Sequence, residues 1–298
     1  MEQLLQLLVA GLALGARYAL VTLGFVVIFR ATGVINFAQG SLVLLGAYLT
    51  YQFAGPWQWP FLLAAITSVI ACGACGPVIE RLLLRRMVGR PAFAVIMVTL
   101  GLLIVIEQAV PTMWGQDPKN MGDPWGIDTV QAGAVTVAVR DLWTLGLTAL
   151  AIAGVFGFFR YSRYGLAMRA TALDQEAAQA QGISVRRVVA LSWTIAGAAA
   201  ALAGITVASG EAGVSPSISQ IALAAFPAAI LGGLDSPYGA IAGGLVIGVS
   251  QTLTAGYQPD HAAWLGDNFH VIMPYVVMIA ILLVRPYGLF GTREVERA

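Results

Sequence analysis

Three polar side chains stand close together in an otherwise apolar N-terminal region, and they are the first candidates for contact with a solute. Asn36, Gln39 and Ser41 lie in the stretch RATGVINFAQGSLVLLGAY, residues 30–48, after Gly33 breaks the first apolar run. Polar groups in an apolar environment cost free energy unless they form hydrogen bonds or line a cavity. Two interpretations stay open: a polar path through a broken helix, or a helix–loop–helix in which Asn and Ser cap a helix end.

Two charged residues inside apolar runs are the second set of candidates. Arg17 lies about 13 residues into the first run, and Glu107 lies about 7 residues from the end of its own run, so their depths differ by roughly 9 Å. An isolated charge at that depth costs several kcal/mol, so Arg17 should face protein, water or a partner. Its role is open among a structural contact with the backbone, a bond to a substrate carboxylate and an ion pair with Glu107.

Residues for catalysis or for nucleotide binding are scarce. Lys119 is the only lysine, and no G-x-x-x-x-G-K-[ST] surrounds it, so the chain lacks the phosphate-binding loop of an ATPase. His261 and His270 show no metal-ligand pattern, and Cys72 and Cys75 fit small apolar packing residues. We therefore expect a protein that is not an enzyme, with no metal and no cofactor of its own.

The composition predicts the environment that must position these residues. Hydrophobic residues make up 58% of the chain and charged residues only 10%, whereas a soluble domain has about 25% charged residues. Runs of roughly 20 apolar residues are long enough to cross a lipid bilayer as helices. The net charge of +1 gives no indication of nucleic-acid binding, because the basic residues cluster at the ends of the apolar runs.

The expected fold class is therefore all-α: a polytopic membrane protein with about eight to nine crossing helices, in one domain over residues 1–298. Two of the runs are short enough to be half-helices buried by their neighbours. Pairs of glycines spaced by four, such as Gly11 with Gly15 and Gly244 with Gly248, predict close helix packing. The expected helical segments are 4–29, 41–54, 60–84, 92–114, 142–159, 188–208, 219–233, 238–256 and 269–285.

Charge in the loops predicts the orientation, because arginines concentrate on the cytoplasmic side of membrane proteins. The basic segments are 80–91, 160–187 and the tail, with Arg81, Arg85, Arg86, Arg90, Arg160, Arg163, Arg169, Arg186, Arg187, Arg293 and Arg297. The loops 115–141, 209–218 and 257–268 are mainly acidic, with Asp117, Asp123, Asp128, Asp141, Glu211, Asp260 and Asp267. An outside N-terminus and a cytoplasmic C-terminus satisfy all of these assignments.

The basic segment 160–187 has the character of a cytoplasmic docking element. It carries five arginines against Asp174 and Glu176. Its centre, from Met168 to Gln181, holds good helix formers without Pro or Gly, and Gly182 is a natural helix stop. We expect a helix there that contacts another subunit.

Several motifs together resemble the high-affinity branched-chain amino-acid permeases of the LivH type. The stretch GVINFAQG at 33–40, followed by LGAY at 45–48, is similar to the family's N-terminal signature. The block ILGG at 230–233 with SPYGA at 236–240 and the tail RPYGLFG at 285–291 match in the same order along the chain. Three departures are Arg17, where a small or apolar residue is expected, Gln39, where the family more often has His, and the stretch GGLDS at 232–236, which lacks the usual Gly before the Ser.

The resemblance implies an ABC importer in a bacterial or archaeal inner (plasma) membrane. Such a system pairs this permease with a homologous LivM-like permease, two P-loop ATPases that bind ATP-Mg, and an extracytoplasmic substrate-binding protein. Substrates of relatives are branched-chain or other amino acids, urea and short amides. The stretch EAAQAQG at 176–182 also resembles the loop of ABC permeases that contacts the ATPase, which implies coupling roles for Arg169, Glu176, Ala177, Ala178 and Gly182.

The main rival function is an ATP-independent secondary carrier. Such a carrier would use Arg17 and Glu107 as an intramembrane ion or proton site. It has no need of the docking segment at 160–187, so that segment favours the importer. An integral-membrane enzyme is a weaker rival, because the chain has no catalytic cluster.

Overall fold

The computed structural model describes residues 2–87, 90–132, 135–210 and 213–291. Six helices are long and apolar enough to cross a membrane: α1 (Glu2–Thr32), α3 (Phe61–Leu82), α4 (Ala92–Trp114), α5 (Val139–Tyr161), α8 (Val185–Ala208) and α10 (Pro237–His261). Shorter helices are α2 (Gln39–Ala54), α6 (Arg163–Leu173), α7 (Gln175–Ala180), α9 (Ile221–Gly232) and α11 (Phe269–Val284). The described residues also form the 3-10 helices η1 (Leu84–Met87), η3 (Pro216–Gln220) and η4 (Ala263–Leu265).

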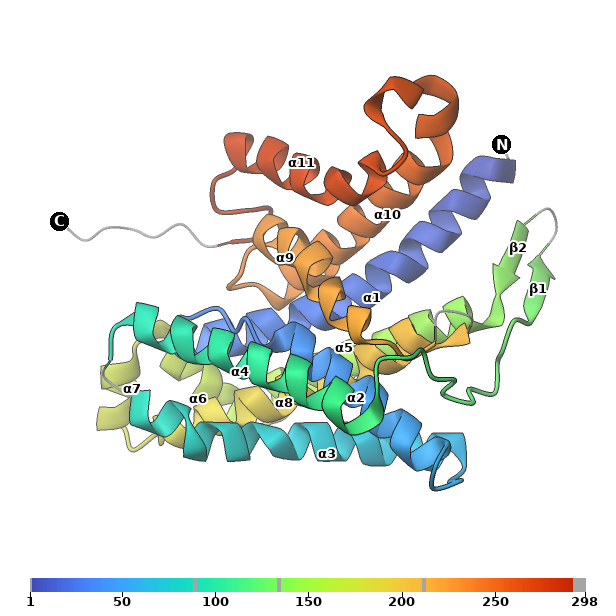
Figure 1. Cartoon of the computed structure of the whole chain (residues 1–298). Coiled ribbons are helices and arrows are strands. Elements are labelled where there is room, and N and C mark those ends of the chain that lie inside the picture. The colour runs from blue at the N-terminus through green and yellow to red at the C-terminus, as the bar shows by residue number, and fades with distance from the viewer. Residues whose placement is uncertain (1, 88–89, 133–134, 211–212, 292–298) are drawn as a thin grey trace.

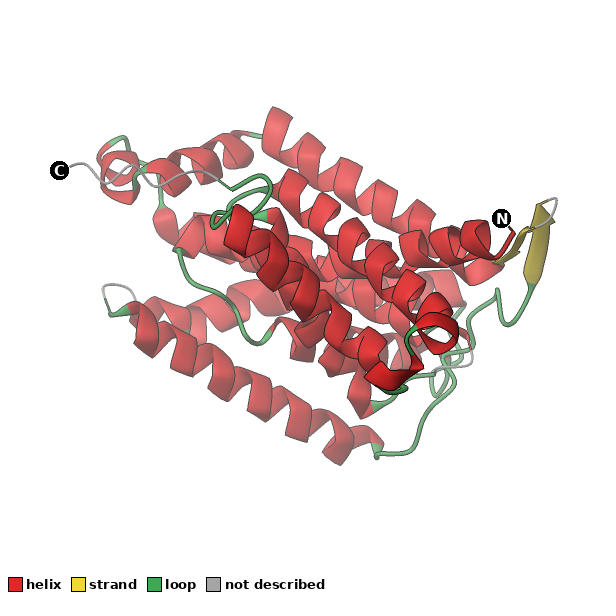
Figure 2. Cartoon of the chain, turned by 90° about the horizontal axis from the view of Figure 1, so that it is seen from above, coloured by secondary structure: helices red, strands yellow, loops and turns green. Residues whose placement is uncertain are grey.

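The prediction of a helical, polytopic chain is confirmed. Each expected helical segment coincides with a helix to within a few residues, and the two short segments are the short helices α2 and α9. The loop expected at 115–141 differs, because β1 (Thr129–Ala132) and β2 (Val135–Ala138) pair there as an antiparallel hairpin. Figure 2 shows this hairpin projecting from the helical bundle. Alternating polar and β-branched residues in TVQA and VTVA suit such a ribbon.

Helix α1 is the central element of the bundle. It packs against α10, α8, α9 and α5 (Figure 1), and it is buried from Tyr18 to Ile28. The predicted close approach of glycines is confirmed here: a Cβ added to Gly15 would lie 2.7 Å from the Cα of Leu245, and one added to Gly248 would overlap Gly15. Glycines let two helices approach this closely where lipid supplies no hydrophobic force between them.

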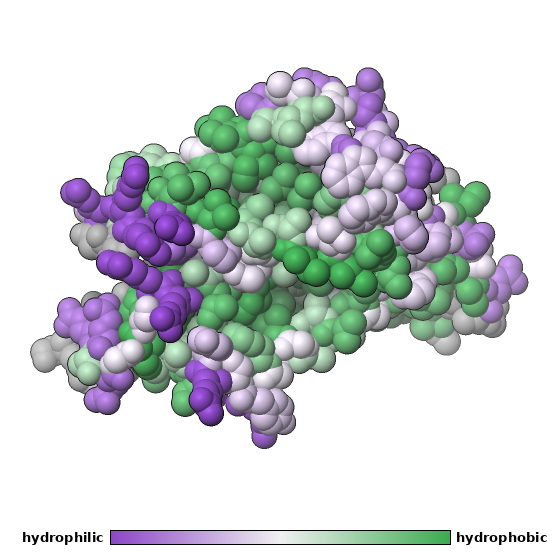
Figure 3. All heavy atoms as spheres, turned by 90° about the horizontal axis from the view of Figure 1, so that it is seen from below, coloured by the Kyte–Doolittle hydropathy of each residue, from purple (hydrophilic) through white to green (hydrophobic). Residues whose placement is uncertain are grey.

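The outer helices expose apolar side chains, as a lipid-facing surface requires. Leu62 and Ile70 on α3 and Ile104 and Val105 on α4 are exposed, as is Leu283 on α11. In Figure 3, apolar residues cover the middle of the face shown, and strongly hydrophilic residues gather toward its margins. The chain is therefore a multi-pass membrane protein.

The hairpin and the start of α1 lie at one end of the bundle, and α6 and α7 lie at the other (Figure 1). The acidic segment 115–141, which contains the hairpin, and the basic segment 160–187 are thus at opposite ends of the bundle. Which end faces the cytoplasm is an inference from the arginines. Glu211, Arg293 and Arg297, which contributed to that inference, lie outside the described residues.

The prediction of one continuous helix from Met168 to Gln181 is wrong. Helix α6 ends at Leu173, and α7 begins at Gln175. Between them Asp174 is extended (φ −157°), and its carboxylate accepts a hydrogen bond from the backbone N–H of Ala177 at 2.9 Å. An Asp side chain that caps a new helix competes with continuation of the old one. The stop at Gly182 is confirmed, since Gly182 has φ +81°.

Candidate functional site

The junction between α1 and α2 is an irregular stretch buried in the bundle. Gly33 takes φ +70°, a conformation that favours glycine, and α2 starts only at Gln39. The hydroxyl of Thr32 donates to the carbonyl of Ile28 at 2.8 Å and accepts from the N–H of Val34 at 3.2 Å. The first bond ties the Thr32 side chain to a carbonyl one turn earlier in α1, and the second gives the N–H of Val34, just beyond the helix end, a partner. The break predicted from sequence therefore exists.

Asn36 and Ser41 are buried and bonded to the local backbone. The Asn36 side-chain oxygen accepts from the N–H of Ala38 at 3.0 Å, and the Ser41 hydroxyl donates to the carbonyl of Ala38 at 2.9 Å. These contacts are of the capping kind. Asn36 also lines the inner cavity described below, whereas Ser41 does not.

Gln39 differs, because it connects two distant helices. Its amide nitrogen donates to the carbonyl of Ala196 on α8 at 3.3 Å, and its side-chain oxygen lies 3.5 Å from the amide nitrogen of Asn36. A Cβ added to Gly24 on α1 would overlap the Gln39 amide. Gln39 is therefore wedged between Gly24 of α1 and Ala196 of α8, and it is fully buried.

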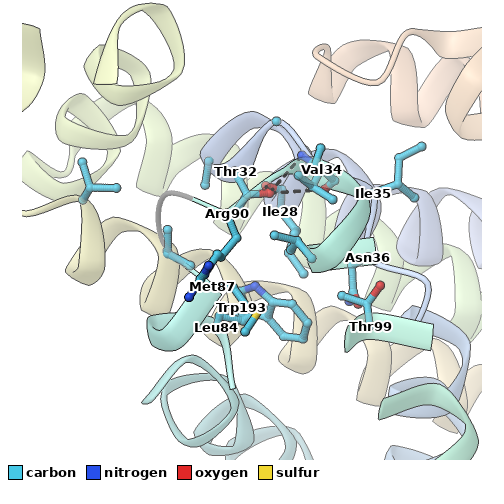
Figure 4. A pocket seen from close by; sticks show the side chains of 16 residues that line it. Ile28, Thr32, Val34, Ile35, Asn36, Leu84, Met87, Arg90, Thr99 and Trp193 are labelled. Carbon is cyan, nitrogen blue, oxygen red and sulfur yellow. Dashed lines mark hydrogen bonds between the residues drawn. The ribbon is translucent and has the colours of Figure 1, made fainter. Parts of the chain in front are cut away.

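An inner cavity of about 310 Å³ lies between the end of α1, the α1–α2 junction, η1, the start of α4 and the start of α8. Its wall is mostly apolar. Figure 4 shows Asn36 and Thr99 on one side of the cavity and Arg90 with Met87 on another. The indole N–H of Trp193, which also lines the cavity, is buried and finds no hydrogen-bond partner among the residues that the structure describes. The cavity thus offers one cation and several hydrogen-bonding groups among apolar walls.

An outer cavity of about 240 Å³ lies against the middle of α1 and the C-terminal end of α8. Among the described residues, Arg17 is the charged residue of its lining, and Tyr18 and two serines add hydroxyl groups. The remaining wall is apolar or glycine. The lining residues are Leu14, Arg17, Tyr18, Val207, Gly213, Ser215, Ser217, Ile218 and Ile221.

Both cavities are lined by α1 and α8, and the boundary between these two helices, which runs from one cavity to the other, is called the groove below. Leu14, Arg17 and Tyr18 of α1 line the outer cavity, and the residues 14 positions later, Ile28, Ala31 and Thr32, line the inner one. Fourteen residues are about four helical turns, so these positions share one face of α1, about 21 Å apart.

Helix α8 repeats this pattern. Val207 lines the outer cavity and Val189 the inner one, and 18 residues are about five turns. Gly24 and Ala196, which hold Gln39, lie between these positions on α1 and α8. The Gln39 side chain therefore stands in the groove between the two cavities.

Arg17 forms an ion pair that sequence reasoning did not anticipate. Its Nη2 lies 2.8 Å from Oδ1 of Asp141, so the pair with Glu107 that the sequence left open is not the pair that forms. Glu107 is half-buried on α4, and within the described residues its carboxylate forms no hydrogen bond or ion pair. Asp141 was placed in a loop, whereas it lies in the first turn of α5. No sequence signal linked positions 124 residues apart.

The docking segment presents a polar surface at the end of the bundle. Arg169, Glu176 and Ala177 are exposed, while Ala178 is buried against the protein. Beneath the turn at Gly182 lies a further cavity of about 460 Å³. Three of its lining residues also line the inner cavity: Leu84, Val185 and Val189. The docking segment and the inner cavity are thus joined through the start of α8.

Metal ligation has no support in the part of the chain that the structure describes, since no group of three His, Cys, Asp or Glu side chains could hold an ion there. His261 contacts the carbonyl of Tyr257 at 3.1 Å. Cys72 and Cys75 are free thiols, the first buried and the second half-buried.

Comparison with known proteins shows similarity along nearly the whole chain. Residues 7–282 match the family described as the permease component of the branched-chain amino acid transport system. The chain is 30% identical to the high-affinity branched-chain amino acid transport system permease protein LivH of Salmonella typhimurium, over 98% of this chain and 97% of that protein. Identity and coverage are the same for the permease protein BraD of Pseudomonas aeruginosa.

A more distant relative and a solved structure extend the similarity. The probable branched-chain amino acid transport permease protein LivH of Methanocaldococcus jannaschii is 27% identical over 91% of this chain and 88% of that protein. A chain in the structure of PsaBC from Streptococcus pneumoniae in complex with Fab superposes with a TM-score of 0.50 at 16% identity. That match covers 96% of this chain and 93% of the other, and it shows a shared fold.

Proposed function

Since the chain belongs to the family of permease components of branched-chain amino acid transport systems, we propose that it is the membrane-spanning subunit of an ABC importer. It works in the inner (plasma) membrane with a homologous permease, two ATPases that bind ATP-Mg, and an extracytoplasmic substrate-binding protein. Its substrate is a branched-chain or other amino acid. The chain itself catalyses no chemical step, and hydrolysis takes place on the partner ATPases.

The observation that carries this proposal is the groove between α1 and α8, with a cavity at each end and Gln39 between them. Alternating access requires a site that opens to either side and a barrier that separates the two. The outer cavity lies at the end with the hairpin, and the inner cavity lies at the end with the docking segment. A solute released by the binding protein enters the outer cavity and leaves through the inner one.

The barrier between the cavities is small and polar at its centre. The bond from Gln39 to Ala196 is a single neutral hydrogen bond of 3.3 Å, which contributes about 0.5–1.5 kcal/mol. Beside it, aromatic rings contribute packing: Phe226 of α9 lies 5.9 Å from Phe25 of α1 and 6.2 Å from Phe37 of the junction, between ring centroids. Such contacts can break and reform in a transport cycle without unfolding either helix.

The docking segment is the element that links the ATPases to this groove. Helix α8 begins at Val185, three residues after Gly182, and its first turns line the inner cavity. A displacement of α7 by an ATPase would therefore move the wall formed by Val185 and Val189. The exposed Glu176 and Ala177 are among the side chains available for that contact.

Charge reversal in the docking segment tests the coupling to an ATPase. Glu176→Lys should leave the permease in the membrane and abolish both ATPase co-purification and uptake. Asp260→Lys is the matched control, because Asp260 is equally an exposed carboxylate but lies at the far end of α10. Normal co-purification and normal uptake by Glu176→Lys would contradict the proposed coupling.

A further inference from the structure

The outer cavity holds a guanidinium group whose hydrogen-bonding capacity is largely unused. We propose that Arg17 binds the carboxylate of the transported amino acid there, and that this contact is what excludes neutral urea and short amides. This inference rests on the proposed function and names the residue that recognises its substrate.

Arg17 is held in place but not saturated. A guanidinium carries five N–H donors, and among the described residues the side chain makes one bond, from Nη2 to Oδ1 of Asp141 at 2.8 Å. Its Nε is buried and has no hydrogen-bond partner within that part of the chain. A buried donor without a partner costs free energy, and a carboxylate is the group that matches the planar fork of Arg best.

The charged groups described near the cavity are paired or lie beside a carboxylate. Asp141 forms the ion pair with Arg17. Arg140 lies beside Gly210, whose backbone N–H donates to Asp123 at 3.3 Å. The ion pair with Asp141 therefore positions Arg17, while the remaining N–H donors of the guanidinium stay available for a second carboxylate.

The rest of the wall suits an amino acid with an apolar side chain. Leu14, Val207, Ile218 and Ile221 form the apolar part. The hydroxyl oxygens of Ser215 and Ser217, which also line the cavity, lie 2.9 Å apart. Their lone pairs can accept hydrogen bonds from the ammonium group of an amino acid.

The volume of the cavity agrees with this solute. At about 30 Å³ for each water in the liquid, the cavity has room for at least about eight water-sized atoms, and leucine has nine non-hydrogen atoms. Urea, with four, would leave the apolar wall uncovered.

The experiment compares charged and neutral solutes in cells that express the complete transporter. The probes are ¹⁴C-labelled L-leucine, L-valine, L-alanine and L-glutamate as carboxylates, with ¹⁴C-urea and ¹⁴C-acetamide as neutral solutes. The wild type should import at least one carboxylate. Arg17→Gln should lower its maximal uptake rate by about tenfold or more, because a charge-assisted bond made during transfer is lost. Arg17→Lys should keep a larger part of the rate than Arg17→Gln.

A double variant separates substrate binding from a structural role. Arg17→Gln alone leaves Asp141 half-buried without its partner, which destabilises the fold. Arg17→Gln with Asp141→Asn removes both charges and should melt near the wild-type temperature, yet its carboxylate uptake should stay low. Wild-type uptake by the double variant would overturn the proposal, because it would show that Arg17 only stabilises the fold.

Two further outcomes distinguish this inference from the proposed function. Import of urea or acetamide alone by the wild type would overturn the carboxylate site and leave the importer intact. Absence of uptake for every probe, together with loss of ATPase co-purification, would refute the importer itself.

Discussion

The substitution Gly24→Ala is the simplest test of the position of Gln39 between α1 and α8. A Cβ at position 24 would overlap the Gln39 amide, so Gln39 would have to move and give up its bond to Ala196. Overpacking costs about 1–3 kcal/mol, and the lost hydrogen bond adds about 0.5–1.5 kcal/mol. Ala also gains about 1 kcal/mol over Gly in a helix interior, so a matched control is needed to remove that gain.

Gly101→Ala is that control. Gly101 lies within α4, and a Cβ added there meets nothing within 4 Å. The propensity gain is common to both variants, so their difference, about 2–4 kcal/mol, isolates the clash with Gln39. At about 2–4 °C for each kcal/mol, Gly24→Ala should melt on the order of 5–10 °C below Gly101→Ala. The assay is thermal unfolding of the purified permease in detergent, followed by intrinsic fluorescence.

Gln39→Ala and the double variant Gly24→Ala with Gln39→Ala complete the cycle. Shortening Gln39 removes the atoms that the new Cβ would overlap, so adding Gly24→Ala to Gln39→Ala should cost much less stability than adding it to the wild type. Equal melting temperatures for Gly24→Ala and Gly101→Ala would refute the wedge of Gln39 between α1 and α8. Additive losses in the double variant would refute it as well.

Two more outcomes follow from the junction and from the C-terminal segment. The double variant Asn36→Leu with Gln39→Leu should insert into the membrane and lose uptake, because the barrier loses its polar groups. The control Gln116→Leu, at an exposed position, should transport normally. Normal uptake by the double variant would favour a purely capping role for Asn36 and Gln39. Gly288→Ala should be less stable than Gly266→Ala by about 1–3 kcal/mol and should melt at a lower temperature. Both glycines have positive φ, but only a Cβ at 288 meets the α9 carbonyls of Ile230 and Leu231. Equal melting temperatures would show that the C-terminal segment packs loosely on α9.

The helices were predictable because each run of apolar residues reports its own burial in lipid. The segment expected at 92–114 is α4, and the short segments proved to be α2 and α9. Glycine spacing likewise predicted the close packing of α1 on α10. Apolar runs and glycine spacing are local features of the chain, so a single sequence is enough to predict the helices and their close packing.

The contacts that form the site were not predictable, because they join positions far apart in sequence. Gln39 was singled out as a polar residue, but its seat between Gly24 and Ala196 depends on how α1, α2 and α8 pack. The partner of Arg17 was missed for the same reason. The break at Asp174 was missed because its helix neighbours favour continuation, while the capping bond favours a new start.

The path between α1 and α8 is tested most directly by the accessibility of single cysteines on one face of α8. Val207→Cys reports on the outer cavity and Val189→Cys on the inner one, five turns apart. Leu202→Cys lies on the same helix and lines neither cavity. Cys72 and Cys75 are replaced by Ala in all variants, and a membrane-impermeant thiol reagent is applied to each side of sealed vesicles.

If the solute moves between α1 and α8, the Val207→Cys thiol should react only from outside and the Val189→Cys thiol only from the cytoplasmic side. The transported solute should protect both cysteines, modification of either should block uptake, and Leu202→Cys should remain unreactive. Reaction of both cavity cysteines from the same side, or modification of both without effect on uptake, would contradict a path through this groove.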